Sequence, residues 1–268
     1  MRVSCLQLDV IPGSPDRNFA KAEGMIARAM AQQPDVLVLP ETWNTGFFPK
    51  AHPETVSDRD CSRVRSQIGA LAKRYGVNIV AGSVTDARDG KIYNTACVFD
   101  RQGALVARYD KTHLFSPAGE DQTYTKGEQI CTFFLDGIRC GIIICYDLRF
   151  PELTRAVCLS GAEVLFVVSQ WPKVRLHQYH TLAAARAIEN QMFVVCCNAC
   201  DNVGGQISGG GSVVVNPLGE RLALAADAEE IITADCGTQV LHKIRSSIPV
   251  FRDRRPELYR YETKEETL

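Results

Sequence analysis

Short apolar runs of strand length alternate along this chain with longer segments that have the spacing of an amphipathic helix. Residues 142–144 and 164–168 contain no polar side chain, which is typical of strands buried on both faces of a sheet. The segments 16–31 and 60–75 instead repeat apolar residues every three or four positions, as on one face of a helix. Strands without a polar face must be covered by other layers. The pattern therefore predicts an α/β protein with layered sheets and helices.

The connections between these segments indicate two sheets. Hairpins are expected around the turns at 101–103 and Asp136-Gly137, and β-helix-β units elsewhere. The expected strands span 2–8, 35–40, 77–84, 91–100, 104–110, 131–135, 139–145, 162–169, 192–199, 212–220 and 229–236, and the expected helices span 16–31, 60–75, 174–190 and a short segment after Pro151. No linker interrupts the chain, so we expect one domain, 1–268, with two sheets between outer helix layers.

Composition excludes several classes of partner. The chain has 268 residues, is 46% hydrophobic and has a net charge of −1, so no overall field favours nucleic acid or an anionic membrane. No apolar stretch approaches the ~20 residues that span a bilayer. The N-terminal sequence MRVSCLQLDV reads as a strand and not as a signal peptide. Eleven cysteines without a disulfide framework favour reduced thiols in the cytoplasm.

Three reactive side chains follow three apolar strands. Glu41 comes after DVLVLP, Lys111 after ALVARYD, and Cys145 after GIII. Layered α/β folds place their sites at the carboxyl ends of strands, so a carboxylate, an ammonium and a thiol are expected to meet there. Each residue also has a structural interpretation: Glu41 as a cap, Lys111 as a surface lysine, and Cys145 as a core residue.

These side chains suit nucleophilic catalysis. A free cysteine has a pKa of about 8.5, so it needs a base to become nucleophilic near neutrality. Glu41 is the candidate general base toward Cys145 and then the general acid toward a leaving amine. Lys111 and the backbone N–H of Tyr146 are candidate donors to the oxyanion, where the loss of one donor typically costs about 3 kcal/mol.

In this order and these contexts, the three residues resemble the Glu-Lys-Cys triad of the nitrilase superfamily of carbon–nitrogen hydrolases. The resemblance spans nearly the whole chain, through LVLPETW, YDKTHLF, CGIIICYDLRFPELTR, AARAIENQMFVV and SGGGSVVVNPLGE. It implies a four-layer αββα sandwich, a homodimer or larger homo-oligomer, and neither a metal nor an organic cofactor. It also implies a second glutamate after the lysine strand, for which Glu120 fits better than Glu128.

The resemblance implies hydrolysis of a small amide through a cysteine thioester. CYD after the nucleophile, and WPKVR later, resemble the bacterial omega-amidase group, which acts on 2-oxoglutaramate and related dicarboxylic acid monoamides. The alternatives are an amidase for deaminated glutathione, a hydrolase of N-carbamoyl amino acids, and a catalytically idle binding scaffold. Many omega-amidase-like sequences have His-Trp where this chain has Gln178-Tyr179-His180. The sequence therefore does not determine the detailed shape of the pocket.

A dicarboxylate monoamide keeps one free carboxylate, so its pocket needs a cation or several N–H donors. Three arginines follow the nucleophile, and we leave open which of them binds substrate. They are Arg149, Arg175 and Arg186. Four aromatic residues are candidate pocket walls, with core packing as the alternative, and Trp171 has the best claim because it follows another strand. The other three are Trp43, Phe47 and Phe48.

Other motifs are set aside. Cys197-Asn198-Ala199-Cys200 has C-x-x-C spacing but no second ligand pair, and His177 and His180 only share a helical face. We therefore expect no metal. The glycine-rich run 204–211 lacks the Gly-Lys-Ser/Thr ending of a phosphate-binding loop.

Overall fold

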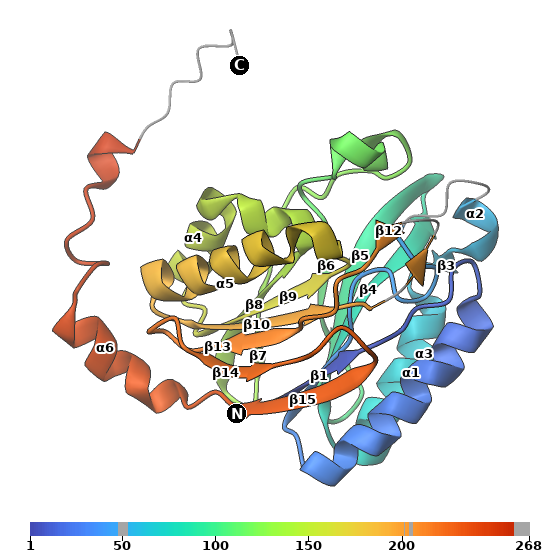
Figure 1. The fold of residues 1–268 in the computed structure, drawn as a ribbon, viewed down its shortest axis with the longest axis horizontal. Helices are drawn as coiled ribbons and strands as arrows, with labels where there is room; N and C mark the ends of the chain where they lie inside the picture. The colour runs from blue at the N-terminus through green and yellow to red at the C-terminus, as the bar shows by residue number, and fades with distance from the viewer. Residues whose placement is uncertain (48–52, 201, 204–205, 260–268) are drawn as a thin grey trace, which may run out of the picture.

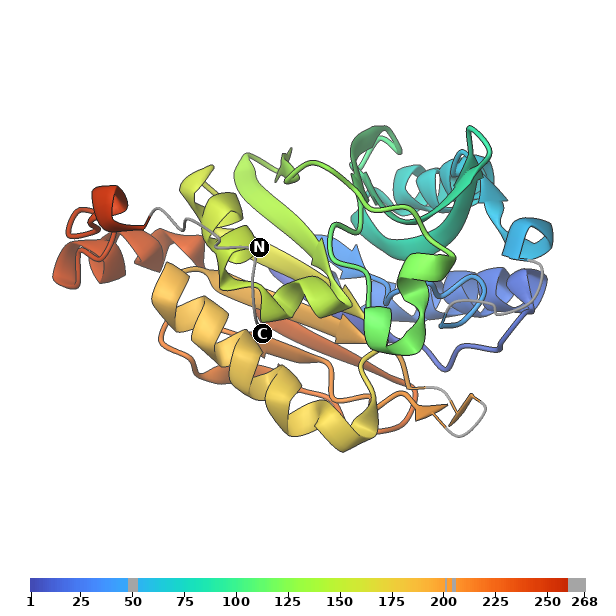
Figure 2. The same cartoon turned by 90° about the horizontal axis from the view of Figure 1, so that it is seen from above.

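Two β-sheets pack face to face at the centre of the molecule, and helices cover their outer faces (Figures 1 and 2). The computed structural model describes residues 1–47, 53–200, 202–203 and 206–259. Helices, two sheets and helices follow one another as layers, as expected for an αββα sandwich.

The first sheet has the strand order β15-β1-β2-β4-β5-β6 among the described residues, and β3 pairs with β4 beside this path. Its strands are β1 (Arg2–Gln7), β2 (Val36–Val38), β3 (Asp58–Arg59), β4 (Asn78–Arg88), β5 (Lys91–Phe99), β6 (Leu105–Asp110) and β15 (Glu230–Asp235). The central strands β1, β2 and β4 are parallel, whereas β5, β6 and β15 are added as antiparallel neighbours.

The second sheet has the order β14-β13-β10-β9-β8-β7 within the described chain. Its strands are β7 (Thr132–Leu135), β8 (Ile138–Ile144), β9 (Val164–Ser169), β10 (Phe193–Asn198), β13 (Val213–Val215) and β14 (Arg221–Leu224). Strands β8, β9 and β10 are parallel, so their carboxyl ends lie at one edge of this sheet. A separate ribbon pairs β11 (Asn202–Val203) with β12 (Gln206–Ile207).

The helices flank the sheets on both sides (Figure 2). α1 (Pro15–Ala29) and α3 (Ser62–Tyr75) cover the first sheet, and α4 (Pro151–Leu159) and α5 (Leu176–Asn190) cover the second. The two shorter helices are α2 (Pro53–Val56) and α6 (Leu241–Ser247). α3 ends as expected, because Gly76 adopts φ +62° and its N–H bonds back to the last turn. No helix in the described part of the chain is long and apolar enough to cross a membrane.

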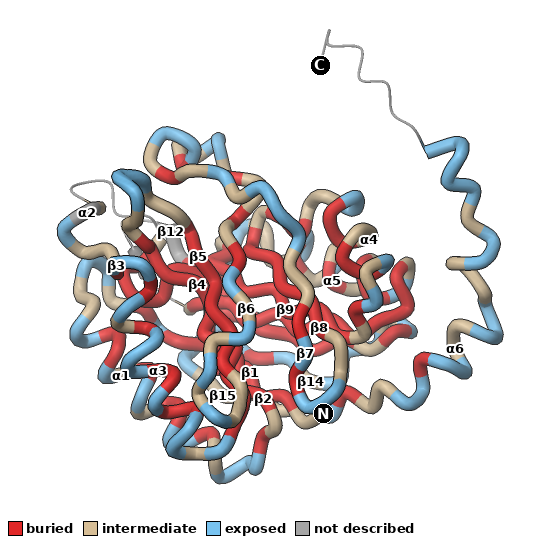
Figure 3. Tube along the Cα trace, turned by 180° about the vertical axis from the view of Figure 1, so that it is seen from behind, coloured by how far each residue is buried: buried red, intermediate tan, exposed pale blue. Residues whose placement is uncertain are grey.

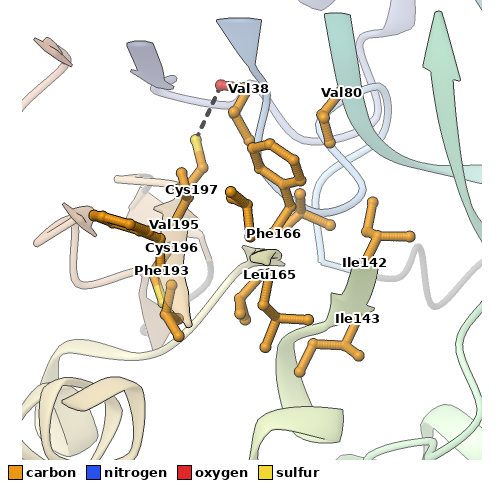
Figure 4. Close-up of a cluster of buried hydrophobic side chains, with 14 of the residues drawn as sticks. Val38, Val80, Ile142, Ile143, Leu165, Phe166, Phe193, Val195, Cys196 and Cys197 are labelled. Carbon is orange, nitrogen blue, oxygen red and sulfur yellow. Dashed lines mark hydrogen bonds between the residues drawn. The ribbon is translucent and has the colours of Figure 1, made fainter. Parts of the chain in front are cut away.

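The two sheets share a wholly buried interface (Figure 4). Val38 and Val80 of the first sheet belong to the same core cluster as Ile142 and Phe166 of the second. Burying one such aliphatic or aromatic side chain contributes about 1.5–3 kcal/mol. Cys197 also crosses the interface, because its thiol donates to the carbonyl oxygen of Val38 at 3.2 Å. The C-x-x-C spacing therefore reflects core packing at this position.

Several short elements were not predicted from the sequence, namely α2, β3, β11 and β12, and two longer ones also differ from the expectation. The helix α6 and the edge strand β14 were not predicted, since only Leu241 of α6 is buried and β14 is mostly exposed. Neither carries the apolar periodicity that reveals buried elements. Figures 1 and 3 show the segment after α6 extending away from the sandwich as a largely exposed arm. Residues 260–268, at the charged end of the chain, lie outside the described residues.

Candidate active site

Glu41 lies just beyond β2 of the first sheet and contacts the carboxyl end of β9 in the second sheet. Its backbone N–H donates to Ser169 O at 3.3 Å, and the Gln170 side-chain amide donates to Glu41 O at 2.9 Å. The backbone N–H of Gln170 donates to Glu41 Oε2 at 2.8 Å. The Glu41 side chain is fully buried. Its hydrogen bonds with Gln170, the residue after β9, fix its position.

A β-bulge in β4 allows the chain to approach the Glu41 segment closely. The register between β4 and β5 shifts between Val80 and Ser83. Gly82 lies inside this shift with φ +59°, and a Cβ there would lie 2.0 Å from Pro40 O. Glycine is therefore required here, and Ser83 N–H can donate to Pro40 O at 3.0 Å.

Lys111 follows β6 and is also fully buried. Its ammonium donates to Glu41 Oε1 at 2.8 Å and to both carboxylate oxygens of Glu120 at 2.9 Å. Burial alone would lower the pKa of Lys111, but the charges of Glu120 and Glu41 outweigh it and hold this pKa well above its usual value. Lys111 is therefore a fixed positive charge inside the molecule.

Glu120 begins a short 3-10 turn (Glu120–Gln122), and its side chain is almost completely buried. Its Oε2 accepts a hydrogen bond of 2.6 Å from the backbone N–H of Phe115. Asn94 on β5 donates through Nδ2 to Glu41 Oε1 at 2.8 Å and to Glu120 Oε1 at 3.2 Å. Glu128, the alternative considered above, is exposed. The structure thus brings Glu120, and not Glu128, to Lys111.

Cys145 stands at the end of β8 and at the start of the 3-10 turn η4 (Cys145–Arg149). Its backbone has φ +48°, a left-handed conformation that is strained for a residue with a side chain. Burial raises the pKa of its thiol well above the usual value. The charge of Glu41, which accepts a hydrogen bond from the thiol, raises it further, against the opposing effect of Lys111. Both effects favour the protonated form of the Cys145 thiol beside the Glu41 carboxylate.

Aromatic rings pack together around Tyr146, the residue that follows Cys145. The partly buried Tyr146 ring lies 5.1 Å from Phe115 and 5.2 Å from Phe150, in edge-to-face contacts. His113 stacks on Phe150 at 3.7 Å between ring centroids. Tyr146 therefore links the Cys145 turn to the segment that carries Glu120.

Trp171 follows the end of β9, as expected, and is 2% exposed. Its backbone N–H donates to Asn198 Oδ1 at 2.6 Å, and its indole N–H donates to Arg175 O at 2.9 Å. The guanidinium of Arg149 stacks over the indole at 4.6 Å and also donates to Gln178 Oε1 at 2.7 Å. Trp171, which follows Gln170, and Arg149, at the end of the turn that begins at Cys145, thus form one packed unit.

The three candidate arginines have different surroundings. Arg186 is 5% exposed and donates to Leu148 O and Glu189 Oε1, which is a structural role. Arg175 lies over the ring of Phe115 at 5.6 Å. Within the described residues, neither Arg149 nor Arg175 forms an ion pair with a carboxylate.

The aromatic residues considered as pocket walls also have different surroundings. Trp43 is a core residue, because it is fully buried against Phe19 at 4.6 Å and donates its indole N–H to Ala81 O. Phe47 is partly buried against the small cluster of Leu114 and Tyr124, beside the Glu120 turn. Phe48 lies outside the described residues.

Residues 178–180, which differ from the His-Trp of many omega-amidase-like sequences, are partly buried. Tyr179 is fully buried with its ring 5.2 Å from Trp171, and His180 Nε2 lies 2.8 Å from Gly211 O. Burial lowers the pKa of His180. The described residues include no group of three His, Cys, Asp or Glu side chains placed to hold a metal ion.

Sequence reasoning missed two residues that contact Glu41. Asn94 and Gln170 are both buried amides, and each uses its side-chain N–H on Glu41. Asn94 interrupts the apolar strand KIYNTACVFD, and Gln170 follows an apolar strand directly. A buried polar residue in such a position is the signal that could have found them.

The family profile described as carbon-nitrogen hydrolase matches residues 2–246, and the chain belongs to that family. It is 40% identical to the 2-oxoglutaramate amidase of Bacillus subtilis, over 96% of this chain and 98% of that protein. It is 32% identical to the omega-amidase NIT2 of Homo sapiens, over 98% of each chain.

Solved structures agree with this assignment. The crystal structure of Saccharomyces cerevisiae Nit3, described as a member of branch 10 of the nitrilase superfamily, superimposes with a TM-score of 0.88. The two chains are 30% identical, and the match covers 95% of this chain and 96% of that one. The protein is a carbon–nitrogen hydrolase that acts on amide C–N bonds.

Proposed function

We propose that Cys145 is the nucleophile and Glu41 the general base and acid of this hydrolase. Cys145 Sγ attacks the amide carbonyl carbon while its proton passes to Glu41. The tetrahedral intermediate then loses its C–N bond, Glu41 returns the proton to nitrogen, and ammonia leaves a thioester on Cys145. Water attacks the thioester with Glu41 as base, which releases the carboxylic acid and the free thiol.

Lys111 and the Tyr146 backbone N–H stabilise the oxyanion in this proposal, and Glu120 orients Lys111. The observation that carries it is the buried contact of Lys111 Nζ with Glu41 and Glu120 beside the thiol of Cys145. A fixed charge in a water-excluded site is worth far more than in water, because no solvent has to reorganise when negative charge develops.

The proposed substrates are dicarboxylic acid monoamides such as 2-oxoglutaramate and succinamate, which makes the protein an omega-amidase. The 40% identity to a 2-oxoglutaramate amidase supports this choice. Arg149 and Arg175 support it independently. Arg149 stacks over Trp171 and Arg175 over Phe115, and in the described chain neither has a carboxylate partner. A substrate carboxylate supplies the missing anion.

Ammonia release from a panel of amides tests the substrate class. We expect kcat/KM for 2-oxoglutaramate and succinamate to exceed the values for deaminated glutathione and N-carbamoyl-β-alanine. A preference for either of the last two would replace the omega-amidase assignment. Release from none of them, together with no selective labelling of Cys145 by an electrophilic amide analogue, would indicate a binding scaffold.

Arginine variants test the carboxylate subsite. Arg175→Gln and Arg149→Gln are compared on succinamate and on butyramide, which lacks the second carboxylate. At least one variant should lose about tenfold or more in kcat/KM on succinamate, since a charge-assisted hydrogen bond is worth about 1.5–3 kcal/mol. Both should keep their activity on butyramide. Equal losses on the two substrates would remove these arginines from carboxylate recognition.

The assembly and the compartment are also part of the proposal. We propose that residues 1–268 form one domain that pairs as a homodimer or larger homo-oligomer, in the cytoplasm. The exposed apolar residues Ile248 and Leu258 on the C-terminal arm support self-association. All eleven cysteines are free, which supports a reducing compartment. Light scattering after size exclusion, with and without the arm, tests the assembly.

A further inference from the structure

Asp147 is a buried carboxylate that the proposed chemistry does not use. It is fully buried and follows the proposed nucleophile by two positions. Its Oδ2 accepts a hydrogen bond of 2.7 Å from the hydroxyl of Tyr109 and one of 3.0 Å from the backbone N–H of Ile144. A buried carboxylate needs such donors, because the loss of hydration is otherwise very costly.

The other oxygen reaches the segment after Lys111. Oδ1 of Asp147 lies 3.0 Å from the Thr112 hydroxyl, 2.9 Å from the backbone N of His113 and 2.8 Å from His113 Nδ1. One side chain thus makes five polar contacts. Its partners are the residue before Cys145 and the residues on both sides of Lys111.

We infer that Asp147 is a positioning residue, which holds the thiol of Cys145 and the ammonium of Lys111 in register with each other. The inference rests on the proposed function of that site. Cys145 has a left-handed backbone that the surrounding structure must maintain, and the bond from Ile144 N–H to Asp147 closes the turn around it. Through Thr112 and His113, the same carboxylate fixes the chain that presents Lys111.

The test is Asp147→Asn, which keeps the shape and removes one acceptor oxygen. Each carboxylate oxygen accepts from a backbone N–H, of Ile144 or of His113, so in either orientation the amide NH2 would face a donor. We expect kcat for ammonia release from succinamate to fall about a hundredfold while KM changes by less than about threefold, since a misplacement of about 1 Å costs that much in rate. Alkylation of Cys145 by iodoacetamide, followed by peptide mass spectrometry, should slow about tenfold or more.

Asp58→Asn is the matched control. Asp58 is a second buried aspartate, and it accepts bonds from Arg59 N, Ser62 Oγ, Arg63 N and Val64 N at the start of α3. It has no contact with the proposed site among its described partners. Asp58→Asn should lower the unfolding midpoint without changing kcat or the alkylation of Cys145. Equal kinetic losses in both variants, or none in Asp147→Asn, would overturn the positioning role.

Tyr109→Phe keeps the inference testable where Asp147→Asn does not fold. It removes only the hydroxyl that donates to Oδ2, and it should lower kcat by about threefold to tenfold at unchanged KM. A folded Tyr109→Phe protein with normal kcat and normal Cys145 alkylation would contradict the inference. Alkylation needs no substrate, so the inference is separable from the proposed function. Wild-type protein that releases no ammonia while Cys145 reactivity still depends on Asp147 would overturn only the function.

Discussion

Lys111 Nζ lies 2.8 Å from Glu41 Oε1 in the interior of the protein, and both side chains are fully buried. A buried ion pair is weak evidence for stability, because desolvation offsets most of the attraction. Here the lysine pairs with two carboxylates, since Glu120 Oε2 lies 2.9 Å from the same nitrogen. The arrangement is therefore better explained by function than by stability.

Removing the lysine charge should destabilise the fold. Lys111→Met leaves Glu41 and Glu120 as two buried carboxylates without a cation, and breaking such a group typically costs about 3–5 kcal/mol. Urea unfolding measures the loss. Lys173→Met is the control, because Lys173 pairs with Asp227 on the surface and its removal should leave the midpoint unchanged. Equal midpoints for the two variants would contradict the buried ion cluster.

The same lysine predicts how stability depends on pH. Its folded-state pKa is raised by Glu120 and Glu41, so the folded protein holds this proton more tightly than the unfolded chain does. The stabilisation is fully present below about pH 10.4, the unfolded value, and is lost as pH rises through the folded pKa. The free energy of unfolding of the wild type should therefore fall in strongly alkaline solution more steeply than that of Lys111→Met. Parallel curves would refute this.

Cys145 should remain a thiol at neutral pH. Burial and the neighbouring Glu41 raise the pKa of this thiol, so the protonated form persists above the usual cysteine value of about 8.5. Thiolate absorbance near 240 nm, compared between wild type and Cys145→Ser, should show no difference from pH 6 to 8. A difference already present at pH 7 would indicate a resting thiolate and would remove the need for Glu41 as base.

Glu120 and Glu128 should respond differently to the same substitution. Glu120→Gln weakens a contact with Lys111 inside the buried cluster and should lower kcat by about tenfold or more, because charge placement in such a site dominates transition-state stabilisation. Glu128→Gln changes an exposed side chain and should leave kcat unchanged. Steady-state ammonia release measures both. A larger loss in Glu128→Gln would reverse the assignment.

Much of the fold could be predicted because most residues of its central strands are apolar. β8, β9 and β10 are buried along their whole length apart from the first two residues of β8. Each can therefore be recognised in the sequence without knowledge of the strand it pairs with. α6 could not be predicted, since a helix with one buried residue has no apolar stripe.

Part of the candidate site could likewise be predicted from the sequence, and part could not. Glu41, Lys111 and Cys145 could be selected because each follows a strand. The contacts of Gln170 with Glu41 could not, because they join segments 129 residues apart from two different sheets. Trp43 shows the converse limit: an aromatic residue in the loop after Glu41 could face the pocket or the core. Only the packing against Phe19 decides between them.

Direct detection of the acyl-enzyme tests the central claim. Wild-type protein is mixed with succinamate, quenched in acid within the first turnovers, and digested for peptide mass spectrometry. We predict that the peptide containing Cys145 gains the mass of the substrate minus ammonia, and that Cys145→Ala shows neither this adduct nor ammonia release while it unfolds at a normal midpoint. Ammonia release by Cys145→Ala at the wild-type rate would contradict the account.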